Sequence, residues 1–276
     1  MKILIICQTL DYYSGSPLYN YTLAMELRAQ GHEVFVYSRW SENKIKENFL
    51  AAGIITLYDR PEGHFDLVLI SQPDFAAVLN DITADQITNI IHSEYDCEAP
   101  IINDRITGYV AIRPSIKEKL IMNYGISETR VRVLYNGIDF KRFNPDARKV
   151  NTEEYIKVVI PCTIDILRMK FLRYYADKAC PGYRVYIYGK DYGNDFKYNQ
   201  YVYVYDQIFN IEDAMTDADY VAGILLGRVN LEARAMGIPS IVHDPENPEK
   251  KEIFFPEYNE FKKRHDVVNL AKEIIL

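Results

Sequence analysis

The strongest constraint on the fold is a repeated alternation of short apolar segments with amphipathic ones. Apolar runs such as KILIIC (2–7) and FDLVLIS (65–71) have the length and composition of strands buried on both faces of a parallel sheet. The segment SPLYNYTLAMELRAQG (16–31) between them has helical periodicity and ends at a glycine. The same alternation predicts strands at 32–38, 88–93, 108–114, 131–139, 155–162, 183–189, 201–206 and 219–226, and helices at 42–53, 115–125, 166–180, 211–218 and 230–237. The chain is therefore predicted to be an α/β protein.

The alternation stops once and then restarts. The stretch NPDARKVNTEEY (144–155) is polar, lacks periodicity and contains a proline, which is typical of a linker. We therefore predict an N-terminal Rossmann-like domain over residues 1–149 and a C-terminal one over residues 150–276. Two consecutive doubly wound sheets of this kind are expected to face one another across a cleft.

Charge and hydropathy exclude two classes of protein. The net charge is −7 and neither half of the chain is basic, which argues against sequence-independent binding to nucleic acid. No apolar run approaches the ~18 residues that a membrane-spanning helix needs, so we expect no transmembrane segment. The apolar part of the opening MKILIICQT is too short for a signal peptide and is better interpreted as a first buried strand.

The cysteines indicate a reducing compartment. Cys7, Cys97, Cys162 and Cys180 form no CxxC pair and show no metal-ligand spacing. We therefore expect a cytoplasmic protein without a structural zinc ion. We also expect no metal ion at the functional site.

The stretch GRVNLEARAMGIPSIV (227–242) points to a phosphate. Arg228 stands where a helical pattern begins, with Glu232 one turn later. The amino end of a helix already carries partial positive charge, so an added cation there favours an anionic ligand. Gly227 would let a phosphate approach the start of the helix. The alternative is an ordinary surface ion pair between Arg228 and Glu232.

Over nearly its whole length the chain resembles the retaining glycosyltransferases of the GT-B fold, in particular the large family 4. SGSPLYNYTLAMELRAQGHEVFVYS resembles the opening of that family, and IIHSEYD resembles its strand that ends in a histidine, here His92. The segment from GYVAIRPS to YNGIDFKRFNP is the most similar. GRVNLEARAMGIPSIV is similar to the family's donor-binding helix, which places Glu232 at the glutamate that holds the nucleotide ribose.

The chain departs from that family at three places. The position of the first of two donor-site glutamates holds Ile224. On the first loop of the second domain, the family's arginine becomes Thr163 and its lysine becomes Arg168. The long C-terminal helices that pack back on the first domain in the family are not expected here.

The resemblance implies three residues in the chemistry, where the leaving diphosphate is stabilised electrostatically. Arg228 and Arg168 are predicted to supply cations to the phosphates. His92 follows an apolar strand and is predicted to bond the transferred sugar or the acceptor. Each has a structural alternative, a solvated arginine or a hydrogen-bonded core histidine.

Five further residues complete the predicted donor site. Gly15 and Ser16 would allow the backbone of the first domain to approach the phosphate or the sugar. Gly227, Lys170 and Glu232 would act from the second domain. The donor is a nucleotide sugar such as a UDP-sugar, and no cofactor is expected.

The leading prediction is a glycosyltransferase that moves the sugar to an acceptor hydroxyl with retention. The acceptor would be a glycan or a lipid-linked sugar of a surface polysaccharide or another glycoconjugate, reached from the cytoplasmic face of the membrane. Some phage enzymes with this general fold glycosylate hydroxymethylated DNA bases, and that alternative stays open although the charge of −7 weighs against it.

Two other classes are kept, a catalytically decayed nucleotide-binding protein and, ranked lower, an epimerase acting on nucleotide sugars. A shortened C-terminus would expose apolar surface for a second copy to cover, so a homodimer is one expected state.

Overall fold

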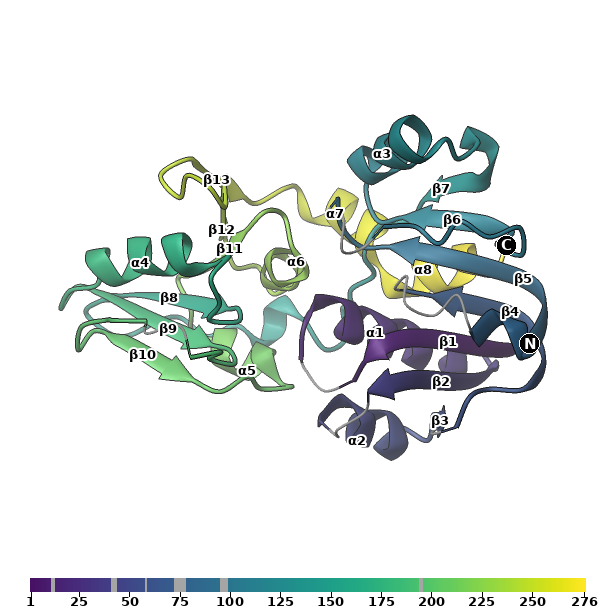
Figure 1. The fold of residues 1–276 in the computed structure, drawn as a ribbon. Helices are drawn as coiled ribbons and strands as arrows, with labels where there is room; N and C mark the ends of the chain where they lie inside the picture. The colour runs from purple at the N-terminus through teal and green to yellow at the C-terminus, as the bar shows by residue number, and fades with distance from the viewer. Residues whose placement is uncertain (11–12, 41–43, 58, 72–77, 95–98, 194–195) are drawn as a thin grey trace. The chain divides into compact units, whose positions relative to one another are not determined.

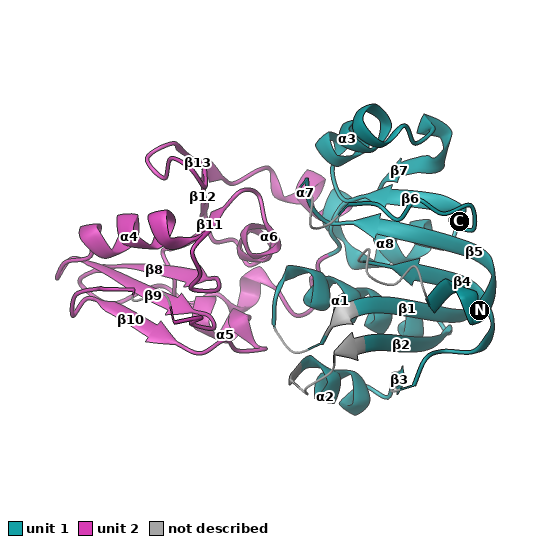
Figure 2. Ribbon diagram, viewed as in Figure 1, with its two compact units in different colours: residues 1–137, 264–276 teal, residues 138–263 magenta. Residues whose placement is uncertain are grey.

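The computed structural model describes residues 1–10, 13–40, 44–57, 59–71, 78–94, 99–193 and 196–276 (Figure 1). The chain divides into two compact units (Figure 2). Unit 1 contains residues Met1–Gly137 and Arg264–Leu276, and unit 2 contains Ile138–Lys263. Each unit is built on one sheet, as the alternation of apolar and amphipathic segments predicts.

Unit 1 contains a seven-stranded sheet in the order β3-β2-β1-β4-β5-β6-β7, and every pair of neighbours is parallel. Its strands are β1 (Lys2–Thr9), β2 (Glu33–Trp40), β3 (Ile55–Leu57), β4 (Gly63–Ile70), β5 (Ile82–Ile91), β6 (Gly108–Ala111) and β7 (Val131–Val133). Its helices are α1 (Gly15–Ala29), α2 (Lys44–Ala51), α3 (Pro114–Tyr124) and α8 (Val267–Ile274). β1 lies inside the sheet, between β2 and β4, and its residues 3–7 are buried, as expected for a parallel strand that is covered on both faces.

Unit 2 contains a six-stranded sheet in the order β10-β9-β8-β11-β12-β13, parallel except for the last pair. Its strands are β8 (Ile156–Pro161), β9 (Tyr183–Tyr188), β10 (Val202–Tyr205), β11 (Tyr220–Ile224), β12 (Ser240–His243) and β13 (Lys251–Phe254). Its helices are α4 (Met169–Lys178), α5 (Ile211–Met215), α6 (Arg228–Ala235) and α7 (Tyr258–His265), of which α7 runs to the border of the unit.

The two faces of the unit 2 sheet belong to different core clusters. Val158 and Ile160 of β8 pack in one cluster with residues of α4, whereas Val159 packs in the other with residues of α5 and α6. This follows from the period of two along a strand, which sends successive side chains to opposite faces. Both units thus have doubly wound, Rossmann-like architecture, and the predicted α/β fold class is confirmed.

The division between the units falls earlier than the predicted domains 1–149 and 150–276. Unit 2 begins at Ile138, and both Ile138 and Phe143 are buried in its core beside residues of α6. The segment ahead of the polar stretch therefore packs with the second sheet. A polar stretch makes few core contacts. The boundary is therefore set by the apolar residues before it, which here pack in the core of unit 2.

The C-terminal segment also differs from the expectation that no helix returns to the first domain. Residues 264–276 belong to unit 1, where α8 packs beside α1. Arg132 of β7 donates to the carbonyl of Glu273 at 2.9 Å. Gly137 lies so close to α8 that a Cβ there would come within 2.8 Å of Leu270. A helix of two turns therefore covers a face of unit 1 that the prediction left open.

None of the helices within the described ranges is both long and apolar enough to cross a membrane. Three cysteines, Cys7, Cys162 and Cys180, carry free thiols. Burial raises the pKa of the Cys7 thiol to about 12. The fourth, Cys97, lies outside the described residues.

Candidate functional site

The topology of unit 2 marks one place on its sheet. The strand order reverses between β8 and its neighbour β11, because β9 and β10 lie on one side of β8 and β12 on the other. In open α/β sheets, ligands bind at the carboxyl edge beside such a reversal. α4 follows β8 and α6 follows β11, so both helices begin at this edge. The predicted residues Arg168, Gly227 and Arg228 stand at these two helix starts.

The start of α6 is shaped by its own backbone. Gly227 is the residue before the helix, and its N–H donates to the side chain of Asn230 at 3.1 Å. Its φ of −88° is ordinary, and a Cβ would meet nothing nearer than 3.9 Å. The absence of a side chain at Gly227 is therefore not required by the fold and is consistent with an approaching ligand. Leu225, two residues earlier, has a φ of 54°, a strained conformation of the kind that collects at functional loops.

Asn230 adds an unsatisfied donor at the same helix start. The residue is fully buried, and its Oδ1 accepts from Gly227 while its Nδ2 has no hydrogen-bond partner in the described part of the chain. A buried amide donor without a partner costs about 1–3 kcal/mol. The first turn of α6 contains no acidic side chain to offset its positive end. An anion is thus favoured here by the helix and by its side chains.

Arg228 and Glu232 form an ion pair on α6, with Nε and Oε1 at 2.6 Å. The two side chains are only 6% and 4% exposed, so the alternative of a surface ion pair is wrong. Burial raises the pKa of the Glu232 carboxyl above its ordinary value, and Arg228 and Arg142 offset part of that rise. Burying both charges carries a desolvation penalty that their mutual attraction repays only partly.

Arg142 extends this pair into a network that the sequence did not indicate. Its guanidinium forms a double hydrogen bond to Glu212 of α5, with both contacts at 2.7 Å. The same group lies over the ring of Phe209, 4.4 Å from the centroid. Arg142 lies three positions after Asp139, whose carboxylate accepts from the backbone N–H groups of residues 141 and 142. In the sequence, Arg142 could have been singled out by its place in the segment NGIDFKRFNP (136–145).

Arg168 at the start of α4 is neutralised by a neighbour. Its guanidinium forms an ion pair with Asp165, and its backbone N–H donates to the same carboxylate at 3.0 Å. Thr163 also donates to Asp165, at 2.9 Å. The positive end of α4 therefore already faces a carboxylate of its own loop. The sequence did not indicate that Asp165 would be the partner of both residues.

The loop that carries Asp165 is held close to the end of β9. A Cβ at Gly189 would lie 1.7 Å from the carbonyl oxygen of Cys162, so no other residue fits there without moving the loop. Ile164 and Tyr192 are joined by a backbone hydrogen bond of 3.1 Å. These contacts fix the course of residues 162–168 and with it the Asp165–Arg168 pair.

Two other positions of unit 2 were singled out in the sequence, Lys170 and Ile224. Lys170 forms an ion pair with Glu246 at 2.7 Å, but the two side chains are 65% and 83% exposed. Ile224, at the position of the family's first glutamate, ends β11 and packs against the core cluster on the α4 side of the sheet. An apolar side chain at this position serves packing.

In unit 1, Gly15 and Ser16 are the first two residues of α1, which follows β1. A Cβ at Gly15 would meet nothing within 4 Å. The sequence predicts the helix from residue 16, and the structure begins it one residue earlier, at Gly15. The first turn contains no acidic side chain. Its backbone N–H groups have no acceptor within the helix, and they lie at the carboxyl edge of a parallel sheet.

His92 directly follows β5, as predicted, and is half-buried. Its ring meets the ring of Tyr19 edge to face, with centroids 4.8 Å apart. On the neighbouring strand, Ser71 donates to the buried side chain of Asn20 at 2.8 Å. The structure thus brings Arg228 and Glu232 together in unit 2, and it places His92 and the Gly15–Ser16 turn in unit 1. The functional roles of these residues stay predictions.

Comparison with known proteins identifies the fold. No protein-family model matches the chain, and no curated protein matches it. Among solved structures, HepE from Anabaena in complex with UDP-glucose superposes with a TM-score of 0.73 at 14% identity, over 99% of this chain and 98% of HepE. A glycosyltransferase from Rickettsia africae ESF-5 gives a TM-score of 0.66 at 12% identity, over 99% and 92%.

WaaG, a glycosyltransferase involved in lipopolysaccharide biosynthesis, gives a TM-score of 0.57 at 12% identity, over 99% of this chain and 91% of WaaG. These similarities cover nearly the whole of both chains in each case. The identities are too low to carry an activity or a family from one protein to the other. The two Rossmann-like units of this chain have the GT-B fold that its structural neighbours share.

Proposed function

We propose that this protein is a glycosyltransferase that uses a nucleotide diphosphate sugar, with a UDP-sugar as the expected donor. The observation that supports this most is the buried Arg228–Glu232 pair at the start of α6, beside the strand reversal of unit 2. Arg228 would contact the diphosphate, and Glu232 would accept hydrogen bonds from the ribose hydroxyls. The fold shared with HepE, whose structure holds UDP-glucose, supports the same donor class.

The proposed reaction proceeds with retention at the sugar carbon and without a metal ion. As the bond to the diphosphate breaks, negative charge grows on the leaving phosphate, and the α6 start together with Arg228 would stabilise it. The departing phosphate oxygen can take the proton of the acceptor hydroxyl. His92 would bond the sugar or the acceptor, and Gly15 and Ser16 would present backbone N–H groups to the donor.

The proposed acceptor is a glycan or a lipid-linked sugar of a surface polysaccharide or another glycoconjugate. The proposed location is therefore the cytoplasm, at the inner face of the membrane where such acceptors are held. WaaG, involved in lipopolysaccharide biosynthesis, has the same fold and supports this acceptor class. A homodimer stays a proposal, to be checked by the molar mass in solution.

The first experiment measures donor binding. UDP and a panel of nucleotide sugars are expected to raise the melting temperature of the protein, because each binds only the folded state. A double variant, Arg228→Met with Glu232→Leu, keeps the site apolar and packed and is expected to lose the shift. Glu252→Gln removes an exposed carboxylate of the same unit and is expected to keep it. If no nucleotide shifts the wild-type melting temperature, the proposal is wrong.

The second experiment measures chemistry. Release of UDP from the donor that binds best, with and without acceptor, reports transfer, and NMR of the product reports its anomeric configuration. An inverted product would contradict retention.

One observation favours a second candidate, a nucleotide-binding protein that transfers nothing. Asp165 neutralises Arg168, and Ile224 packs in the core where the family has a glutamate. Binding of UDP without hydrolysis or transfer of any donor sugar would establish this candidate instead.

A further inference from the structure

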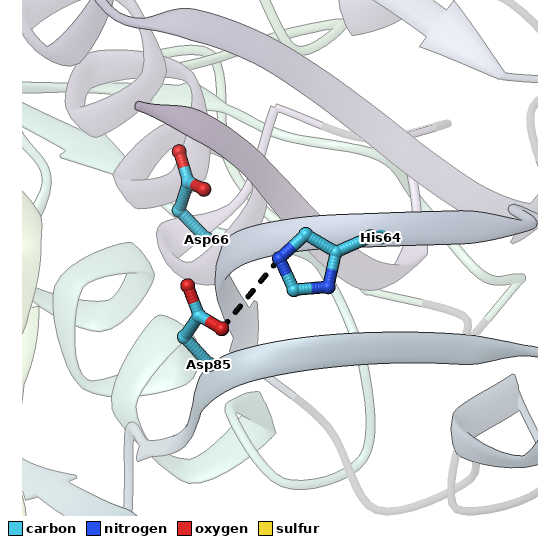
Figure 3. A group of neighbouring side chains, drawn as sticks. All are labelled: His64, Asp66 and Asp85. Atoms are coloured by element: carbon cyan, nitrogen blue, oxygen red, sulfur yellow. Dashed lines mark ion pairs between the residues drawn. The ribbon is translucent and has the colours of Figure 1, made fainter.

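A second group of chemically capable side chains lies in unit 1, far along the strands from the carboxyl edge. His64 and Asp66 stand near the start of β4, and Asp85 stands near the start of β5 (Figure 3). One ligand atom from each of the three residues lies within 4.8 Å of the others. His92 follows the opposite end of β5, so this cluster is separate from the predicted site residues of the same unit.

The sheet itself brings the three side chains together. His64 and Asp66 are two positions apart on one strand and therefore project from the same face. β4 and β5 pair in parallel with His64 opposite Thr83, so Thr83 and Asp85 project beside them. Figure 3 shows Asp85 next to His64 and Asp66. Backbone hydrogen bonds of two paired strands hold these positions, so a ligand would meet a rigid arrangement rather than a loop.

Neighbouring groups orient two of the three side chains. The Thr83 hydroxyl donates to the carbonyl of Gly63 at 3.4 Å, and its oxygen forms a hydrogen bond of 3.2 Å with Nδ1 of His64. Asp66 accepts from the backbone N–H of Lys2 at 2.6 Å. Outer contacts of this kind, which fix the tautomer of a histidine and the direction of a carboxylate, are typical of metal ligands.

The ring of His64 directs its second nitrogen toward a carboxylate. Nε2 lies 3.5 Å from Oδ1 of Asp85, and the carboxylate of Asp66 lies beside both. A cation between these atoms would contact one imidazole nitrogen and two carboxylate oxygens. Two carboxylates with one imidazole nitrogen form a donor set that suits a first-row divalent metal.

We propose that His64, Asp66 and Asp85 bind one divalent transition-metal ion of the zinc type, with water completing its coordination. The imidazole distinguishes this site from magnesium and calcium sites, which use oxygen ligands. The side chains of His64 and Asp85 are 55% and 67% exposed, so the ion can enter from solvent. The ion would join the starts of β4 and β5, and through Asp66 and Lys2 also that of β1. It takes no part in the proposed sugar transfer.

The test uses the full chain without a histidine tag, after removal of metal with a chelator. Titration with zinc, followed calorimetrically, is expected to show one equivalent bound. Cobalt is expected to give the visible absorption bands of a site with nitrogen and oxygen ligands. His64→Gln and Asp85→Asn are each expected to weaken zinc binding by at least about tenfold.

Two matched controls separate this site from other surface groups. His32→Gln removes another imidazole of unit 1, and Glu118→Gln removes an exposed carboxylate of α3. Both variants are expected to bind zinc as the wild type does. Zinc should also raise the melting temperature of the wild type and of both controls, but not that of His64→Gln.

Three results would overturn the proposal. Zinc binding by Asp85→Asn or His64→Gln with wild-type affinity would place the ion elsewhere. Equal binding of magnesium, unaffected by His64→Gln, would indicate an oxygen-only site. No binding by the wild type would show that the cluster holds no metal ion. Both substituted side chains of the cluster are polar and at the surface, so each variant is expected to fold without metal, which its circular dichroism checks.

Discussion

The amino ends of α4 and α6 follow neighbouring strands of one sheet, yet their charges are satisfied in different ways. At α4, Asp165 accepts from the helix backbone and pairs with Arg168, and both side chains are partly exposed. At α6 the first turn holds a cation and no acid, and its partner Glu232 is almost fully buried. The amino end of α4 therefore already faces a carboxylate of its own loop, whereas the first turn of α6 has no carboxylate and contains the unsatisfied amide of Asn230.

This difference explains why only one of the two ends suits a diphosphate. An anion at α4 would have to compete with Asp165 for the same cation and the same backbone group. An anion at α6 would meet no acidic side chain in the first turn. The pair at α6 also costs desolvation, so stability alone does not account for it. The four predictions below test this contrast, from the largest expected effect to the smallest.

Breaking the α6 pair should strongly destabilise the protein. Arg228→Met leaves the buried Glu232 carboxylate without its counter-charge, which is expected to lower the free energy of unfolding by about 3–5 kcal/mol. The double variant Arg228→Met with Glu232→Leu should regain most of this loss. Urea-induced unfolding measures both. If Arg228→Met costs less than about 1 kcal/mol, the pair is not buried as described.

Removing the cation should affect catalysis at α6 much more than at α4. Arg228→Gln is expected to lower kcat/KM for sugar transfer roughly 100- to 1000-fold, as the loss of one preorganised charge does in other sites. Arg168→Gln is expected to lower it less than about tenfold, because Asp165 already neutralises that side chain. Steady-state kinetics with the donor identified above compare the two. Equal losses would remove the distinction between the helix ends.

The α6 site should lose nucleotide affinity in acid. Burial raises the pKa of Glu232 above its ordinary value of 4.5, and only the ionised carboxylate can accept from both ribose hydroxyls. As the pH falls through this raised pKa, the dissociation constant of UDP should increase by up to about tenfold per pH unit. Calorimetry over a series of pH values measures it, with Glu252→Gln as the control that keeps the transition.

The same raised pKa fixes the sign of the effect on folding. A carboxyl with a raised pKa in the folded state contributes stability that is fully present below its unfolded pKa and is lost as the pH rises through the folded one. Glu232 therefore stabilises the free protein in acid, where it weakens nucleotide binding. A dissociation constant that stays unchanged down to pH 4.5 would contradict the role of Glu232.

Opening the α4 end should give the smallest effect. Asp165→Asn removes the negative charge but keeps an oxygen that can accept from the Arg168 N–H. A nucleotide diphosphate nearby would no longer be repelled, so UDP is expected to bind roughly two- to fivefold more tightly. Calorimetric titration of the variant against the wild type measures the change. Weaker binding would indicate that Asp165 positions Arg168 for the donor.

Residue patterns predicted the two sheets because buried parallel strands and amphipathic helices leave local signals. Arg228 begins α6 as predicted, since a glycine before a helical pattern is visible in the sequence. The network around it was not visible. Arg142 and Glu212 lie 70 positions apart, so only the folded chain reveals their contact.

The sequence also did not reveal side-chain contacts that depend on the folded course of a loop or on the register of two strands. Asp165 lies three positions before Arg168, but their pairing depends on a loop held against Gly189. His64 and Asp66 show the spacing of one strand face, whereas Asp85 joins them only through the register of β4 and β5. Packing between distant segments similarly determined that α8 covers unit 1.

The return of residues 264–276 to unit 1 makes that unit discontinuous along the chain. During synthesis, all seven strands of the first sheet are made before unit 2, but unit 1 would remain without α8 until the whole of unit 2 had been synthesised. Unit 2, by contrast, is one continuous segment and can complete its core earlier. The assembly of the first unit is thus coupled to the production of the second, although each has a sheet of its own.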